Sequence, residues 1–256
     1  MYSIMLNRSK TSFRSLLALL ILALAATGCA ALTPPPKTPE GLLKEAKSIF
    51  KGNNYPEVIR TLNNLLQEFP DSPERVEGLL LLAHSHYLMD EYLEAKFHYE
   101  RFVELYPAHP KTAQAMYYRA LCDYGLMDTA LRDQTAAENA IRNFQKVLDE
   151  HPESPFASKA RQKIQDCKKS LADNQMEIAR FYYRTSSFLS AINRFQTIIN
   201  KYPESPFIDE AYFLLGESYF FEQNFENARK SYAQLVKSYP RSPYVREARS
   251  RLREIP

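Results

Sequence analysis

Apolar residues recur at the spacing of amphipathic helices along most of the chain, in pairs of segments separated by short polar turns. The last pair shows this best, with Tyr212, Leu215, Gly216 and Tyr219 on one face of a first helix and Phe225, Ala228, Tyr232 and Leu235 on one face of a second. Gly216 and Ala228 are small where two such helices would cross, and the aromatic residues would fill the space around them. The pattern predicts a helix-turn-helix unit.

A proline motif closes each unit. An aromatic or His residue is followed by Pro, two residues and a second Pro, in five copies that begin at Phe69, Tyr106, His151, Tyr202 and Tyr239. Proline lacks a backbone donor and clashes with the preceding turn, so each copy should end one helix, and the Ser or His before the second Pro can cap the next. The copies are 37 to 51 residues apart, close to or above the ~34 residues of a tetratricopeptide unit.

Aligned on these prolines, the earlier repeats have apolar residues at the same positions. The first has Leu42, Ala46, Ile49, Tyr55, Val58, Leu62 and Leu65; the second has Leu79, Leu82, Ala83, Tyr92, Ala95, Tyr99 and Phe102; the fourth has Ile178, Ala179, Tyr182, Phe188, Ala191, Phe195 and Ile198. The sequence therefore predicts an all-α tetratricopeptide superhelix of about five units, a fold that usually presents a binding surface.

Two departures divide the array. In the third repeat, a first helix with Tyr117 and a second with Phe144 are joined by a lengthened loop near Met127 to Thr135. The fourth repeat is preceded by a polar helical stretch that should run from Phe156 to Tyr183 as one long helix. We expect front repeats one to three in 40–152, back repeats four and five in 153–240, and a C-terminal helix in 241–256.

The N-terminal segment has the order of a secretory signal. Three basic residues precede an apolar run, and Thr27-Gly28-Cys29 follows it. This order resembles the bacterial lipoprotein signal, which implies that 1–28 is removed and that Cys29 becomes the acylated first residue, with Ala30 favouring the outer membrane. Residues 29–39 would then be the acylated Cys and a Pro-rich spacer. The alternative is an ordinary signal peptide with a chance Cys.

Charge does not favour nucleic acid as a partner. Without 1–28 the chain has 30 Lys and Arg against 30 Asp and Glu, so no net positive field would attract a nucleic acid. The only local basic cluster runs from Arg241 to Arg253, and no later segment approaches the ~20 apolar residues of a membrane span.

Candidate catalytic and metal-binding residues are few. His84 and His86 are two residues apart, on different helix faces, and no His-Glu-x-x-His pattern occurs. No Ser, Thr or Cys has a recognisable nucleophile context. We therefore predict no enzyme, no cofactor and no metal, and we expect Cys122 and Cys167 to be two unpaired, half-buried thiols although the periplasm would allow a disulfide.

The whole mature chain resembles the BamD family of tetratricopeptide lipoproteins, which belong to the machinery that folds β-barrels into the bacterial outer membrane. The resemblance rests on the acylated Cys, the spacer, the five repeats, the segment Met116 to Leu121 with the lengthened loop after it, and the segment Ala179 to Tyr183 leading to Asn193-Arg194. It implies a lipid-anchored protein at the periplasmic face of the outer membrane. Its partners would be unfolded barrel proteins at the front, the periplasmic domain of the barrel subunit at the back, and accessory assembly lipoproteins.

Candidate site residues follow this division. First helices line the concave face of such a superhelix, and we expect this set to face a front groove for substrate peptides: Lys47, Phe50, His84, Tyr87, Leu88, Tyr118 and Cys122. Aromatic rings beside a cation suit an extended peptide that ends in an aromatic residue and a carboxylate. By the resemblance, Arg194 contacts the barrel subunit, where its guanidinium could pair with a carboxylate. The alternatives are rings that only seal adjacent helices and a solvated surface Arg.

Two other functions stay open from the residues alone. One is a periplasmic tetratricopeptide adaptor of the Tol-Pal and cell-wall coordination type, which would usually have an N-terminal coiled coil and a soluble signal. The other is a cell-wall hydrolase with a helical-repeat domain, which would need an acid and base pair in a cleft. Neither signature is evident in the sequence.

Overall fold

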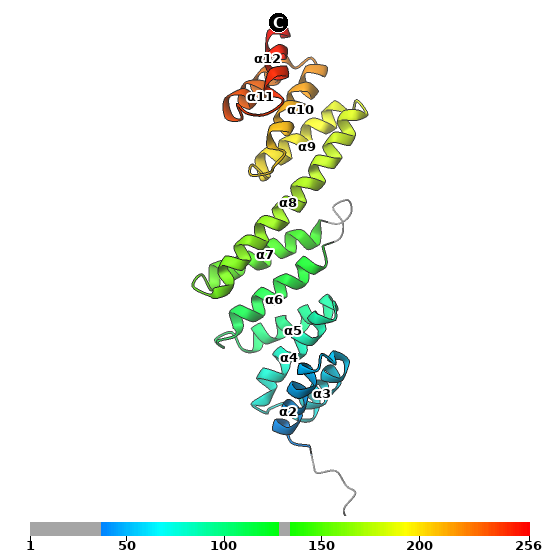
Figure 1. The fold of residues 1–256 in the computed structure, drawn as a ribbon, viewed down its shortest axis with the longest axis vertical. Coiled ribbons are helices and arrows are strands. Elements are labelled where there is room, and N and C mark those ends of the chain that lie inside the picture. The colour runs from blue at the N-terminus through cyan, green and yellow to red at the C-terminus, as the bar shows by residue number, and fades with distance from the viewer. Residues whose placement is uncertain (1–36, 128–133) are drawn as a thin grey trace, which may run out of the picture.

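The computed structural model describes residues 37–127 and 134–256, and all regular structure within those ranges is helical. The helices stack one after another into a single elongated array, with α2 and α12 at opposite ends (Figure 1). Their bounds are α2 Pro39–Lys51, α3 Tyr55–Glu68, α4 Glu74–Leu88, α5 Tyr92–Leu105, α6 Thr112–Gly125, α7 Thr135–Glu150, α8 Pro155–Arg184, α9 Phe188–Lys201, α10 Ile208–Phe221, α11 Phe225–Ser238 and α12 Val245–Glu254. The predicted all-α tetratricopeptide superhelix is confirmed.

The long helix predicted in the middle of the chain is α8, which runs unbroken from Pro155 to Arg184. Its first half packs against α7 through Ala160, Ile164 and Cys167, and its second half packs against α9 through residues that include Met176. One helix therefore belongs to two core clusters and joins the front repeats to the back repeats.

The five proline motifs share one backbone conformation. The residue before the first proline ends its helix with φ between −128° and −138° and ψ between 55° and 63° in all five copies, because a following proline excludes the helical conformation. The predicted cap is only partly correct. Four of the five predicted side chains accept the backbone N–H two residues further on: His109 from Lys111, Ser154 from Phe156, Ser205 from Phe207 and Ser242 from Tyr244. Only Ser154 directly precedes its helix, and Ser72 Oγ has no partner within the described residues.

A second repeated feature was not predicted. The turn between the two helices of a repeat contains a residue with φ of 58° or 59°, namely Asn53, Asp90, Ser186 and Gln223. Aromatic rings three residues before and two residues after it pack together in each case, with centroids 5.5 Å apart for Phe50–Tyr55, 5.8 Å for Tyr87–Tyr92, 5.9 Å for Tyr183–Phe188 and 5.7 Å for Phe220–Phe225. The equivalent turn of the third repeat includes 128–133, outside the described residues.

Cys122 and Cys167 form no disulfide within the described residues, as predicted, but they are fully buried instead of half-buried. Burial raises the pKa of both Cys122 and Cys167 to about 12, so both stay protonated and unreactive at neutral pH. Cys29, the proposed anchor, lies outside the described residues. No helix in 37–127 or 134–256 has the length and apolar character to cross a membrane.

Candidate functional site

Four of the seven predicted groove residues form one group of rings, which we call the front aromatic cluster: Phe50, His84, Tyr87 and Tyr118. Phe50 comes from α2, His84 and Tyr87 from α4, and Tyr118 from α6. The His84 ring lies 6.0 Å from Phe50, 6.0 Å from Tyr87 and 4.9 Å from Tyr118, and Tyr87 and Tyr118 are 5.4 Å apart. Because these are the first helices of repeats one to three, the cluster spans the front half.

A buried tyrosine that sequence reasoning did not assign to the site holds the centre of the cluster. His84 Nδ1 lies 3.0 Å from the hydroxyl of Tyr99 on α5, and the Tyr99 ring stacks on Tyr118 at 5.7 Å. Burial lowers the pKa of His84, so the ring is neutral at neutral pH. The four cluster rings are half-buried: each packs between helices and also leaves part of its surface accessible to a ligand.

Three other groove candidates lie differently. Lys47 Nζ is 2.6 Å from Glu77 Oε2, and both side chains are close to half exposed, so its charge is already paired at the surface. Leu88 is exposed. The expectation that Cys122 faces the groove is wrong, because its side chain is fully buried against α4 and α5 residues such as Ala83 and Ala95.

Arg194 is half-buried on α9 and is held by a neighbour that sequence reasoning missed. Its Nη1 donates to Gln175 Oε1 of α8 at 3.0 Å, and no carboxylate within 37–127 or 134–256 pairs with it. Arg180, also in the back half, differs: its Nε and Nη2 donate to both oxygens of Glu210 at 2.9 and 2.7 Å. Of these two arginines, Arg194 has a fixed guanidinium that is still available to an acid.

A buried polar network joins α5, α6 and α7. Asp123 of α6 is 2 % exposed and accepts from Lys96 of α5 and from Asn143 of α7, each at 2.6 Å. Arg119 donates to the Asn143 side-chain oxygen at 3.2 Å. These contacts join three helices and satisfy a buried carboxylate, which is a structural role. Within the described part of the chain, no group of three or more His, Cys, Asp and Glu side chains could hold a metal ion.

Comparison with known proteins places this geometry in a family. The family model described as "Outer membrane lipoprotein", YfiO, matches residues 35–223, and a tetratricopeptide repeat model matches 210–242. The chain is 28% identical over 209 residues to the outer membrane protein assembly factor BamD of Caulobacter vibrioides, covering 79% of this chain and 68% of that protein. It is 26% identical over 215 residues to BamD of Haemophilus influenzae, covering 79% and 82%.

Among solved structures, the TPR2AB-domain:pHSP90 complex of yeast Sti1 is 19% identical, with a TM-score of 0.46 and coverage of 85% of this chain and 82% of that one. The family match extends over well more than half of the sequence and includes the front aromatic cluster and Arg194. The chain therefore belongs to the YfiO family of outer membrane lipoproteins, the family of the BamD assembly factors.

Proposed function

We propose that this protein is a non-catalytic scaffold of outer-membrane β-barrel assembly, anchored by an acylated Cys29 at the periplasmic face of the outer membrane. In this proposal the front half binds unfolded barrel proteins, the back half binds the periplasmic domain of the barrel subunit, and accessory lipoproteins attach elsewhere. The family match supports assembly, and the front aromatic cluster is the single observation that supports the substrate site.

The cluster suits a peptide by its chemistry. Aromatic rings bind well to each other in edge-to-face and offset arrangements, and the half-buried rings of Phe50, Tyr87 and Tyr118 offer such partners from three helices. One turn before Phe50 on α2, Lys47 could exchange Glu77 for the carboxylate of a bound peptide. An exposed ion pair of this kind contributes only ~0–1 kcal/mol, so the exchange costs little.

In the back half, Arg194 is the proposed contact to the barrel subunit. Gln175 fixes Nη1 of the guanidinium, which leaves its other two nitrogens for charge-assisted hydrogen bonds to a carboxylate of the partner. The family match favours this assembly function over the Tol-Pal adaptor considered above.

Two binding assays, which should respond to different substitutions, test the proposal. The first measures fluorescence anisotropy of a labelled peptide that ends in an aromatic residue and a free carboxylate; the second measures retention of the barrel subunit's periplasmic domain on the immobilised protein. Tyr87→Ala or Phe50→Ala should weaken peptide binding at least fivefold and leave retention of the domain unchanged, and Arg194→Glu should do the opposite.

Matched controls are Phe97→Ala, an exposed ring outside the cluster, and Arg184→Glu, an exposed cation on α8. Circular dichroism melting confirms that each variant is folded. If Tyr87→Ala and Arg194→Glu, both folded, bind peptide and domain as the wild type does, the proposed sites are wrong.

A further inference from the structure

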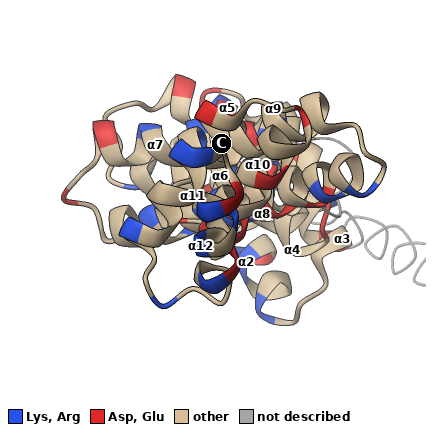
Figure 2. Cartoon of the chain, turned by 90° about the horizontal axis from the view of Figure 1, so that it is seen from above, with Lys and Arg blue, Asp and Glu red and all other residues tan. Residues whose placement is uncertain are grey.

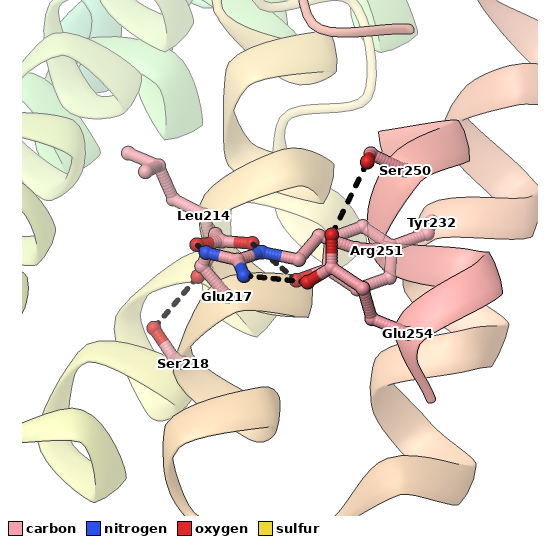
Figure 3. Close-up of polar contacts among 7 residues, drawn as sticks. All are labelled: Leu214, Glu217, Ser218, Tyr232, Ser250, Arg251 and Glu254. Atoms are coloured by element: carbon pink, nitrogen blue, oxygen red, sulfur yellow. Dashed lines mark hydrogen bonds and ion pairs between the residues drawn. The ribbon is translucent and has the colours of Figure 1, made fainter. Parts of the chain in front are cut away.

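The C-terminal helix α12 is fixed by one face. Val245 is buried, and Ala248 and Ile255, the residue after the helix, belong to the core cluster of the last repeat. Arg251 donates from two nitrogens to both oxygens of the buried Glu217 on α10, and Glu254 accepts from the same guanidinium (Figure 3). A bidentate pair of this kind holds the helix in one rotational position, so its outward face is fixed as well.

That outward face carries three arginines. At 100° per residue, Arg246, Arg249 and Arg253 fall within a sector of about 60° on α12, and all three side chains are exposed. We call these residues the arginine stripe. None of them makes a hydrogen bond or ion pair with any residue in 37–127 or 134–256. The stripe lies at the end of the array opposite α2, and Figure 2 views the molecule from the α12 end.

Solubility alone does not account for this stripe. The last helix of a repeat array needs a polar outer face, but that face could combine both signs of charge. Like charges three and four residues apart on a helix repel each other, and Arg249 and Arg253 have this spacing. The acids of α12 point to the side of Arg251: Glu254 binds Arg251, with a weaker effect from the charge of Arg253, and the charge of Glu247 acts on Tyr183.

We propose that the arginine stripe is a docking site for an acidic helix of a partner protein. Arginine presents a planar fork that matches a carboxylate in two-point contact, and three forks on a rigid helix select carboxylates at matching intervals. A protein fits better than a membrane, because the proposed acyl anchor precedes α2 and α12 is at the other end of the array (Figure 1). This surface is separate from the front aromatic cluster and from Arg194.

The test uses the purified full chain and a labelled helical peptide with Glu at positions i, i+3 and i+7, with the matching Gln peptide as its counterpart. Fluorescence anisotropy should give a dissociation constant at least tenfold weaker for the triple variant Arg246→Glu, Arg249→Glu, Arg253→Glu. The triple Lys variant keeps the charge and loses the fork, so it should weaken binding by a smaller factor of about threefold. The Gln peptide should bind neither protein.

A control variant with the same change in net charge is Lys146→Glu, Arg161→Glu, Lys168→Glu, three exposed cations on α7 and α8. It should bind the Glu peptide within twofold of the wild type. Equal weakening by the stripe and control variants would overturn the proposal, since binding would then follow net charge alone. Stripe-dependent sedimentation with phosphatidylglycerol vesicles, without stripe-dependent binding of the peptide, would also overturn it and assign the surface to lipid.

If the Glu variant melts earlier than the wild type, the triple Gln variant replaces it, with the same expected loss of peptide binding. These measurements involve neither the barrel subunit nor its substrates. Failure of the stripe proposal is therefore distinguishable from failure of the assembly function.

Discussion

Gly216 on α10 lies directly against the ring of Tyr232 on α11. A Cβ atom at Gly216 would be 2.5 Å from Tyr232 Cε1, closer than two carbon atoms can approach. The ring is fully buried and its hydroxyl donates to the buried Glu217, which Arg251 also binds. The close approach of α10 and α11 therefore depends on the absence of a side chain at Gly216 and on the fixed position of the Tyr232 ring.

Gly216→Ala should lower the free energy of unfolding by about 1–3 kcal/mol, although Ala is intrinsically the better helix former by ~1 kcal/mol. Urea unfolding followed by circular dichroism measures this. Gly78→Ala is the matched control: its Cβ would meet the terminal Cδ2 of Leu65 at 2.8 Å, an aliphatic group that can rotate away, so its cost should be smaller. Equal stability of Gly216→Ala and wild type would show that Tyr232 is free to move.

Arg251→Ala should destabilise the C-terminal end of the array. Glu217 is 3 % exposed, and removal of Arg251 would leave its carboxylate with Tyr232 as its remaining partner, at a cost of about 3 kcal/mol. We expect faster proteolysis within 241–256 and a lower urea midpoint. Arg249→Ala is the control, because this exposed side chain has no partner in the described chain and should change stability by less than ~0.5 kcal/mol. Similar proteolysis of both variants would contradict the anchoring role.

Ser186→Gly should stabilise the protein by about 0.5–1 kcal/mol. Ser186 has φ of 58°, a left-handed conformation that costs a residue with a Cβ roughly 1–2 kcal/mol, less the entropy that glycine loses on folding. Thermal melting measures the effect. Ser187→Gly is the control, because φ there is −87° and glycine brings no such relief. Destabilisation by both substitutions would show that the serine side chain outweighs the backbone conformation.

The free energy of unfolding should fall on acidification because of the protonation of His98. Burial, with smaller effects from His86 and Arg101, lowers the pKa of His98 from 6.5 to about 4. Between these two pKa values the unfolded chain binds the proton more readily than the folded chain. The contribution of neutral His98 to the free energy of unfolding is therefore fully present above pH 6.5 and declines as the pH falls towards 4. His84 acts in the same direction.

His98→Gln removes this titration, so its urea midpoint should fall less than that of the wild type between pH 6.5 and 5. Measurements above pH 5 keep most carboxylates out of the comparison. Parallel curves for the two proteins would exclude His98 as a source of the pH dependence.

Local patterns in the sequence were enough to predict the repeats and the long helix α8. They were also enough to predict that the four rings of the front aromatic cluster lie near one another. The five proline motifs define helix ends because proline excludes the helical conformation in the residue before it. The repeat spacing then places Phe50 and Tyr87 at equivalent positions of the first helices, and Tyr118 lies on the first helix of the next repeat. The aromatic pairs around the left-handed turns could have been found in the same way, because their spacing is constant. Arg194 was found by resemblance, and nothing in its own surroundings in the sequence indicated Gln175.

The sequence by itself determined the periodic features of this protein: where its helices end, which faces are apolar and the order of its repeats. These depend on residues close to one another in the chain. The tertiary structure decided the partners: that Glu77 pairs with Lys47, that Tyr99 holds His84 and that Cys122 is fully buried. It also decided that Arg251 is bound, whereas Arg246, Arg249 and Arg253 have no ion pair within 37–127 or 134–256. Those outcomes depend on how helices from different repeats approach one another, and a local pattern carries no information on that approach.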